Sequence, residues 1–244
     1  MATPRFYCPV PLSASSEFEL PAVAAHHASR VLRLRVQDAV QIFDGSGQEW
    51  YGRIREISGK KVVLEQLQAG TVEREPPLSI VLAQALCSSE KMDWVVQKAT
   101  ELGVAAIQPV QTRRSVAKLA GERAEKRTEH WRGVIIAACE QCGRNRLPLI
   151  HAPQEFSTWL AGVRKTRDAK FILLPQATAS LKQQPKPQGD VTLLIGPEGG
   201  FQEDEMQLAQ QAGFIPVRLG ARILRTETAA LAAVTALQTL WGDL

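Results

Sequence analysis

The chain has 244 residues, of which 45% are hydrophobic and 22% charged, and its formal net charge is +4 at pH 7. This composition excludes an intrinsically disordered chain and is typical of a globular protein with one large or two modest domains. No stretch approaches the roughly 18 apolar residues of a membrane span, the first residues lack the apolar core of a signal peptide, and four cysteines do not indicate a disulfide scaffold. We therefore expect a cytoplasmic protein with reduced thiols.

The first 72 residues predict a small, barrel-like β domain. Apolar residues alternate in segments 40–43 and 50–54, on either side of an Asp-Gly-Ser-Gly turn at 44–47, a pattern typical of a β-hairpin. Residues 62–67 predict a further strand, and residues 22–33 predict a short helix.

Arginines gather at the end of that expected helix, at Arg30, Arg33 and Arg35. The planar guanidinium group can donate two parallel hydrogen bonds to a phosphate, so we interpret these residues as candidate RNA contacts. A solvated surface turn explains them equally well. An excess of basic residues between Lys91 and Arg146 accounts for the net positive charge, and it fits either a phosphate-binding surface or a helix face with mixed charges.

The polar segment 70–77, which ends in two prolines, predicts a boundary between a domain at 1–72 and a domain at 73–244. Beyond it, short apolar segments alternate with segments of helical periodicity, which favours a mostly parallel α/β sheet. The segment 176–189, rich in glutamine, proline and lysine, is expected to be an exposed loop. The expected strands are 78–83, 105–110, 171–174, 191–195 and 215–219, and the expected helices are 92–102, 122–142, 203–212 and 227–241.

The segment 195–201 is the first candidate for chemistry. It follows an expected strand and precedes an expected helix, and ligands of open α/β sheets bind outside the carboxyl ends of the strands. Its three glycines allow the backbone to approach a ligand closely. Glu198 stands in the middle of this constrained loop, where an ordinary surface carboxylate is not expected. A purely structural glycine turn is the alternative.

The segment 219–229 is the second candidate, because it also joins an expected strand to an expected helix. Helix capping explains Thr226, and the helix dipole explains Glu227 in the first turn. Neither explains Arg222 and Arg225. Together the two loops predict a pocket with mixed apolar and polar walls.

Other ligand classes lack their motifs. The chain has no G-x-x-x-x-G-K-[ST] loop, and the glycines at 45 and 47 open no helix, so neither nucleotide fingerprint is present. Cys139 and Cys142 form a single C-x-x-C pair on an expected helix, whereas a structural zinc site needs four ligands. We therefore expect no metal. His27, beside the arginine-rich segment, is expected either to contact RNA or to pack within its domain.

Five segments together closely resemble the ribosomal small subunit methyltransferase E family, and they cover nearly the whole chain in order. The two candidate loops read G-P-E-G-G from Gly196 and L-G-x-R-I-L-R-T-E-T from Leu219. The other three read R-V-L-R from Arg30, Q-K-A-T-E-L-G-V from Gln97 and E-Q-C-G-R-N-R-L-P from Glu140.

This resemblance implies an α/β fold of the SPOUT class, with an N-terminal PUA-like β-barrel and a C-terminal trefoil-knotted methyltransferase domain. It implies a homodimer that uses S-adenosylmethionine to methylate N3 of one uridine in 16S rRNA of the small ribosomal subunit, without a metal or a membrane partner.

The resemblance also implies roles for residues of this sequence. Glu198 is the candidate base or uracil-orienting group, and Arg225 is the candidate for stabilising negative charge on a uracil oxygen. Arg144 and Arg146 are expected to reach the RNA or the site of the second subunit, and the three arginines after the first helix are expected to contact RNA. The residues expected to hold the methyl donor are Leu174, Pro175, Ile195, Gly196, Pro197, Gly199, Gly200, Leu219, Gly220, Ile223, Leu224 and Thr226.

Two other functions stay open. The chain can be an RNA-binding assembly factor without catalysis, although the intact Glu198 and Arg225 argue against that. It can also be a methyltransferase of the same class that acts on tRNA or on a ribose hydroxyl. The small residues of helix 227–241 fit a dimer interface or a helix packed within one chain.

Overall fold

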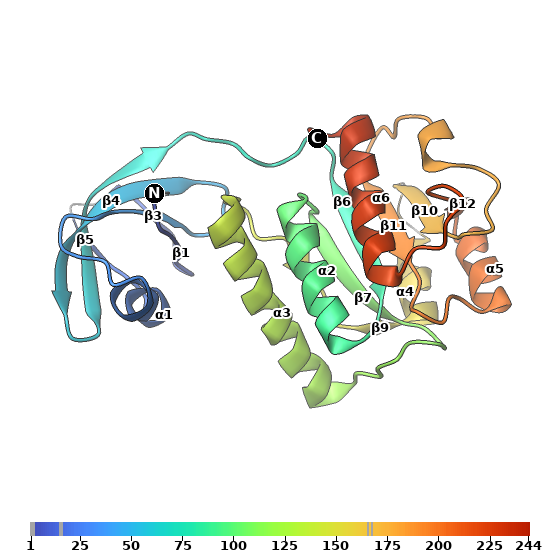
Figure 1. Ribbon diagram of the computed structural model, residues 1–244, viewed down its shortest axis with the longest axis horizontal. Coiled ribbons are helices and arrows are strands. Elements are labelled where there is room, and N and C mark those ends of the chain that lie inside the picture. Colours follow the sequence, from blue (N-terminus) through green and yellow to red (C-terminus); the bar gives the residue numbers. More distant parts are fainter. Residues whose placement is uncertain (1–2, 15–16, 165, 167) are drawn as a thin grey trace. The chain divides into compact units, whose positions relative to one another are not determined.

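The computed structural model describes residues 3–14, 17–164, 166 and 168–244, and the chain divides into two compact units (Figure 1). Unit 1 comprises Met1–Glu75 and Ile136–Leu147, and unit 2 comprises Pro76–Ile135 and Pro148–Leu244. The helix α3 (Gly121–Cys142) therefore begins in unit 2 and ends in unit 1.

Unit 1 is built on a five-stranded sheet in the order β1-β3-β4-β5-β2. The strands β3 and β4 are antiparallel and flank the turn at 44–47, which confirms the predicted hairpin. The first strand is parallel to β3, and the remaining pairs are antiparallel. The strands are β1 (Arg5–Tyr7), β2 (Glu17–Glu19), β3 (Ala39–Phe43), β4 (Glu49–Ser58) and β5 (Lys61–Gly70).

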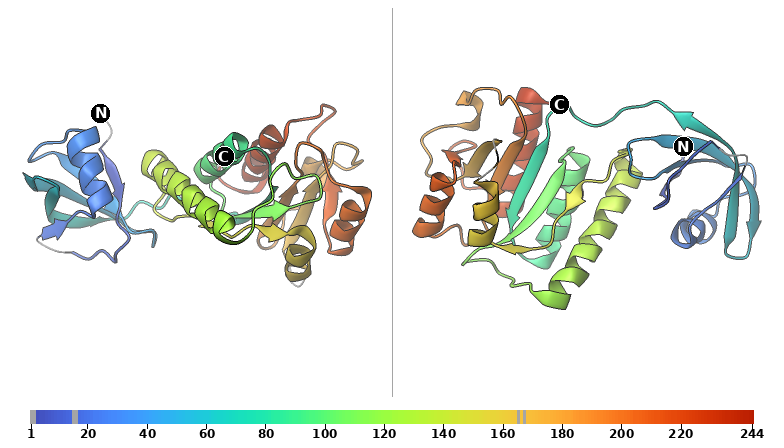
Figure 2. Two further views of the ribbon diagram at one scale, coloured as in Figure 1. Left: turned by 90° about the horizontal axis from the view of Figure 1, so that it is seen from below. Right: turned by 180° about the vertical axis from the view of Figure 1, so that it is seen from behind.

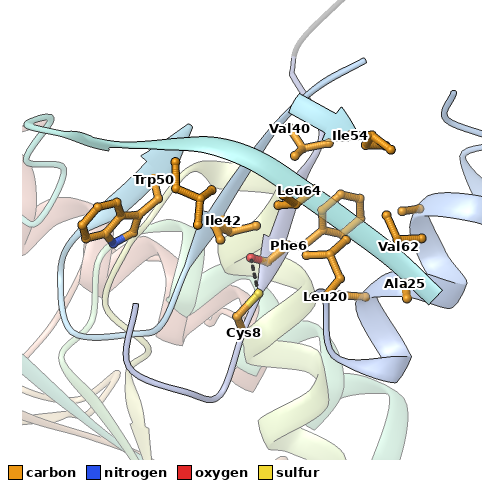
Figure 3. Packing of buried hydrophobic residues seen from close by; sticks show 13 residues of the cluster. Phe6, Cys8, Leu20, Ala25, Val40, Ile42, Trp50, Ile54, Val62 and Leu64 are labelled. Carbon is orange, nitrogen blue, oxygen red and sulfur yellow. Dashed lines mark hydrogen bonds between the residues drawn. The ribbon is translucent and has the colours of Figure 1, made fainter. Parts of the chain in front are cut away.

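The core of unit 1 lies between this sheet and a short helix, α1 (Ala22–His26). Alternation along the strands sends Ile42 and Leu64 inward, and both are fully buried beside Phe6 (Figure 3). The helix continues as a π-helical turn, η1 (His27–Val31). His27 packs its ring edge-on against Phe6, with the ring centroids 5.8 Å apart, so the packing role of this histidine is the one observed.

A buried charge cluster ties the strands of unit 1 to the segment that leaves the sheet. Glu49 is 1% exposed, and its Oε2 accepts hydrogen bonds from Arg5 Nη1 at 3.1 Å and from Arg74 Nη1 at 2.6 Å. Its Oε1 accepts a hydrogen bond from the Tyr51 hydroxyl at 2.6 Å. Burial raises the pKa of Glu49, but hydrogen bonds from Tyr51, Arg74, Asn145 and Arg5 outweigh it, so the pKa lies below its usual value.

The same cluster holds the segment after α3. Arg5 Nη2 donates hydrogen bonds to Asn145 Oδ1 at 2.8 Å and to the Arg144 carbonyl at 3.1 Å. Arg144 is itself buried, and its guanidinium group donates to the carboxylate of Glu75. Residues 144–145 are thereby fixed to the first strand of unit 1.

Unit 2 contains a seven-stranded sheet in which every pairing is parallel, as the alternation of strands and helices predicted. The order is β12-β10-β11-β6-β7-β8, and β9 also pairs with β7. The strand β11 lies between β10 and β6, so the order of the strands along the sheet reverses at this point. Such switch points are where ligands bind in α/β sheets. The strands are β6 (Ile80–Ala85), β7 (Ala106–Gln111), β8 (Leu149–Ile150), β9 (Gln154–Glu155), β10 (Ala169–Leu173), β11 (Val191–Ile195) and β12 (Ile215–Val217).

Helices cover both faces of this sheet (Figures 1 and 2). The helices α2 (Ser89–Glu101) and α6 (Thr226–Trp241) pack against each other, and α6 contacts β6 and β11. The helices α4 (Phe156–Val163) and α5 (Glu203–Gln211) pack together over an aromatic core that includes Trp159, Phe201 and Phe214. The predicted loop at 176–189 contains a short helical turn, η2 (Leu181–Gln183), whose Leu181 is buried.

Candidate functional site

A cavity of about 550 Å³ opens at the carboxyl ends of β10, β11 and β12 in unit 2. Its walls come mainly from the segments that directly follow these strands and from the first turn of α6, with one residue each from α2 and α5. The volume lies within the range of roughly 300–1,000 Å³ that small-molecule sites occupy. The cavity is the place at which the sheet topology and the sequence motifs both predict a ligand.

The structure brings together all but one of the residues predicted to form the methyl-donor site and the catalytic pair. Those that line the cavity are Leu174, Pro175, Ile195, Gly196, Pro197, Glu198, Gly200, Leu219, Gly220, Ile223, Leu224, Arg225 and Thr226. Their roles stay predictions, whereas their convergence on one cavity is observed.

Gly199 does not line the cavity. A Cβ atom at this position would lie 3.2 Å from the Cβ of Arg114, and Arg114 Nη1 donates a hydrogen bond to the Gly199 carbonyl at 2.9 Å. The glycine therefore allows the loop after β7 to lie against the glycine loop, which is a structural reason for a small residue here.

Two glycines of the cavity have backbone conformations that other residues rarely adopt. Gly200 has φ +69° and Gly220 has φ +114°. A Cβ atom at either position would meet no protein atom within 4 Å. The backbone at these two glycines is therefore open on the side where a side chain would stand, and a ligand can approach it closely there.

Thr226 joins the two candidate loops. Its hydroxyl donates a hydrogen bond to the Gly196 carbonyl at 2.6 Å and accepts one from Gln84 Nε2 at 2.9 Å. The prediction that Thr226 caps the last helix is wrong, because the N-cap residue is Arg225 and no side-chain cap is formed. The hydroxyl connects the glycine loop to the arginine loop instead.

A lysine that the motifs did not predict lies at the mouth of the cavity. Lys91 Nζ, in the first turn of α2, lies 3.2 Å from Glu198 Oε1 and 3.5 Å from Glu227 Oε2. The backbone N–H of Ser88 also points to Glu198 Oε1, at 3.4 Å. Lys91 is separated from Glu198 by 107 residues, so no local pattern could have joined them.

This arrangement keeps Glu198 ionised. Burial raises the pKa of Glu198, but its own backbone N–H, the Lys91 ammonium group and the Ser88 N–H outweigh it, so the pKa lies below its usual value. The paired carboxylate raises the pKa of Lys91 in turn. The site therefore presents a charged carboxylate and a charged ammonium group at neutral pH.

Seven further residues line the cavity. Phe201, Arg222 and Ala229 belong to the two candidate segments, whereas the other four lie outside those segments and were missed. Some of the seven are apolar and close the wall beside the glycine loop, and two are further arginines. They are Leu173, Gln176, Phe201, Met206, Arg218, Arg222 and Ala229.

The predicted RNA-binding arginines belong to unit 1 and differ in exposure. Arg30, Arg33 and Arg35 are exposed, and Arg33 has a left-handed backbone with φ +53°. Arg146 is also exposed. Arg144 is buried on Glu75, so its observed role is an ion pair, and an RNA contact by Arg144 stays a prediction.

Within the described ranges, no group of three or more histidine, cysteine or acidic residues could hold a metal ion. No helix of the described part is long and apolar enough to cross a membrane. Cys139 and Cys142 are free thiols, and burial raises the pKa of Cys139 to about 12.

Comparison with known proteins identifies relatives over the full length. The family description "RNA methyltransferase domain" matches residues 74–238, and "RNA methyltransferase PUA domain" matches residues 23–67. The ribosomal RNA small subunit methyltransferase E of Buchnera aphidicola is 35% identical, over 98% of this chain and 94% of its own length.

Two solved methyltransferase structures are similar to this chain over its full length. A putative methyltransferase of Legionella pneumophila, in complex with S-adenosylmethionine, is 39% identical with a TM-score of 0.94. A ribosomal RNA small subunit methyltransferase E of Neisseria gonorrhoeae, bound to S-adenosylmethionine, is 39% identical with a TM-score of 0.92. Each covers 100% of both chains.

Proposed function

As a member of the ribosomal RNA small subunit methyltransferase E family, this chain is an S-adenosylmethionine-dependent rRNA methyltransferase, and we propose that it methylates N3 of one uridine in 16S rRNA. The observation that carries the proposal is the cavity at the carboxyl ends of β10, β11 and β12, in which both strand-end loops meet a charged Glu198 and Lys91.

The cavity fits the methyl donor in size and in chemistry. Apolar side chains such as Leu174, Ile195 and Leu224 suit an adenine ring, and the open backbone at Gly200 and Gly220 can reach polar atoms of a ligand. When bound, S-adenosylmethionine supplies a methyl group whose transfer forms a nitrogen–carbon bond, and the broken carbon–sulfur bond leaves its electron pair on sulfur. Alignment of the two reacting atoms is then a large part of the catalysis.

Glu198 and Arg225 have complementary roles in this proposal. Uridine N3 carries an imide proton that must leave, and the ionised Glu198 carboxylate accepts it and passes it to solvent. Arg225 is exposed at the cavity, where its guanidinium group stabilises the negative charge that develops on a uracil oxygen. Thr226 holds the two loops that carry these groups.

The proposal extends to the organisation of the chain. We assign residues 1–72 to a PUA-like RNA-binding domain and residues 73–244 to a trefoil-knotted methyltransferase domain that works as a cytoplasmic homodimer. Arg30, Arg33 and Arg35 support RNA binding by the first domain. They are exposed, and their guanidinium groups form no ion pair with any residue that the structure describes. Arg146 is a further exposed candidate.

Methyl transfer from radiolabelled S-adenosylmethionine to small ribosomal subunits that lack the modification tests the function. The expected product is labelled 3-methyluridine in 16S rRNA. Label on a ribose hydroxyl or in tRNA would support the other methyltransferase activity. Binding of the small subunit without any transfer would support a non-catalytic assembly factor.

A further inference from the structure

A second hollow adjoins the methyl-donor cavity in unit 2. It has a volume of about 470 Å³ and is lined by Glu90, Lys91, Trp94, Arg225, Glu227 and Thr228. It lies between the first half of α2 and the first turn of α6, two helices that pack against each other. Because Lys91 and Arg225 line both spaces, a group in the hollow borders a group in the cavity.

The hollow contains an aromatic side chain that the core does not use. Trp94 is 44% exposed, although a tryptophan usually buries most of its surface. It follows Lys91 by three residues on α2, so both side chains lie on one face of the helix. An exposed indole next to cations is a feature of sites that bind an unstacked RNA base, because the ring face of any base can stack on it.

The charged groups of the hollow match the reactive edge of uracil. Uracil N3 stands between two carbonyl groups, and its negative charge after loss of the proton spreads onto both oxygens. Lys91 and Arg225 supply two cations for two oxygens. Glu198 and Glu227 hold the Lys91 ammonium group at 3.2 and 3.5 Å, which fixes one of these cations.

We propose that this hollow receives the target uracil, stacked on Trp94, with O2 and O4 facing Lys91 and Arg225 and with N3 toward the methyl-donor cavity. The proposal rests on the proposed function and adds the place and the discrimination of the base. Cytosine carries an amino group in place of one carbonyl beside N3. That amino group would direct its hydrogens at a cation, so the site disfavours cytosine.

Direct binding of short RNAs tests the subsite without catalysis. The probes are fluorescently labelled uridine and cytidine hexanucleotides, with affinity read by anisotropy and stacking read by quenching of tryptophan fluorescence. The full-length protein is expected to bind the uridine probe about tenfold more tightly than the cytidine probe and to be quenched by it. Lys91→Met is expected to reduce this preference to near one, and Lys91→Arg to preserve most of it.

Matched variants distinguish a specific loss of base binding from a general effect of substitution on the helix. Trp94→Phe is expected to remove the quenching and keep the affinity, because phenylalanine also stacks, whereas Trp94→Ala is expected to lower the affinity about tenfold. Lys98→Met, on the same helix but paired with Glu101, is expected to change neither readout.

Equal binding of the two probes would overturn the proposal, as would unchanged affinity of Trp94→Ala. A change in oligomeric state of Trp94→Ala would also overturn it, because Trp94 would then be covered by a second copy. If the subsite behaves as expected but no RNA is methylated, the proposed function fails and the base-binding site stands.

Discussion

A cluster of charged side chains in unit 1 and another in unit 2 differ in how completely they are buried and paired. In unit 1, Glu49 is 1% exposed and accepts hydrogen bonds from two arginines and a tyrosine. In unit 2, Lys91 and Glu198 pair at the mouth of a cavity, with side chains 28% and 29% exposed. A network of many paired, mostly buried groups fixes a structure, whereas a partly open ion pair retains capacity to bind. We therefore expect the first cluster to stabilise the fold and the second to take part in the proposed chemistry.

Removal of the central charge in unit 1 is expected to have the largest effect. Glu49→Gln leaves Arg5 and Arg74 beside a neutral group in a buried site, which costs about 3–5 kcal/mol of the free energy of unfolding. Urea denaturation of the full chain measures this. Glu19→Gln is the matched control, because its ion pair with Lys61 is exposed, and the expected change is within about 0.5 kcal/mol.

The pH dependence of the free energy of unfolding in acid tests the same role of Glu49. Since the pKa of Glu49 in the folded chain lies below the ordinary value of 4.5, its contribution is complete above pH 4.5 and is lost as the pH falls through the folded pKa. The stability of Glu49→Gln should therefore fall less steeply in acid than that of the parent. Equal slopes would contradict the stabilising role of this carboxylate.

The corresponding change in unit 2 should affect turnover and leave stability nearly intact. Glu198→Gln removes the proposed proton acceptor, and we expect the rate of methyl transfer to fall about 100-fold or more. The affinity for S-adenosylmethionine should stay within about threefold, because the glycine loop keeps its shape. Glu203→Gln, an exposed carboxylate in the first turn of the next helix, serves as the control. Unchanged turnover in Glu198→Gln would exclude the base role.

Thr226→Val should have a smaller effect on both properties. The change removes the hydroxyl that links Gly196 to Gln84 and leaves two buried polar groups without this partner, which costs about 1–3 kcal/mol. Because the two loops would lose their connection, the affinity for S-adenosylmethionine should also fall, by about tenfold. Thr239→Val, an exposed threonine of the same helix, should change neither quantity. An unchanged affinity in Thr226→Val would show that the loops keep their arrangement without the hydroxyl.

The sequence predicted those parts of the fold that depend on local pattern. The hairpin around residues 44–47, the parallel sheet and the last helix each carry a periodicity or turn signal of their own. The helix α4 was missed because it has eight residues and no side-chain cap. The strand β1 was missed because three residues are too few to establish an alternation.

The candidate site could be predicted only as far as its residues are near in sequence. Gly196 and Arg225 belong to recognisable loops, and the sheet topology brings these loops to one cavity. Lys91 and Trp94 come from a helix much earlier in the chain, so their place at the cavity depends on tertiary packing. The ion pair of Arg144 with Glu75 depends on packing in the same way.

Isothermal titration of S-adenosylmethionine against the parent and the Gly200→Val variant tests the central claim most directly. Gly200 lines the cavity with φ +69°, a conformation that a β-branched residue rarely adopts, whereas Gly189→Val lies in open surroundings with no positive φ and serves as the control. The account predicts binding by the parent and by Gly189→Val and none by Gly200→Val. Equal binding by all three proteins would contradict the placement of the methyl donor in the cavity of unit 2, and absence of binding by the folded parent would contradict the methyltransferase activity itself.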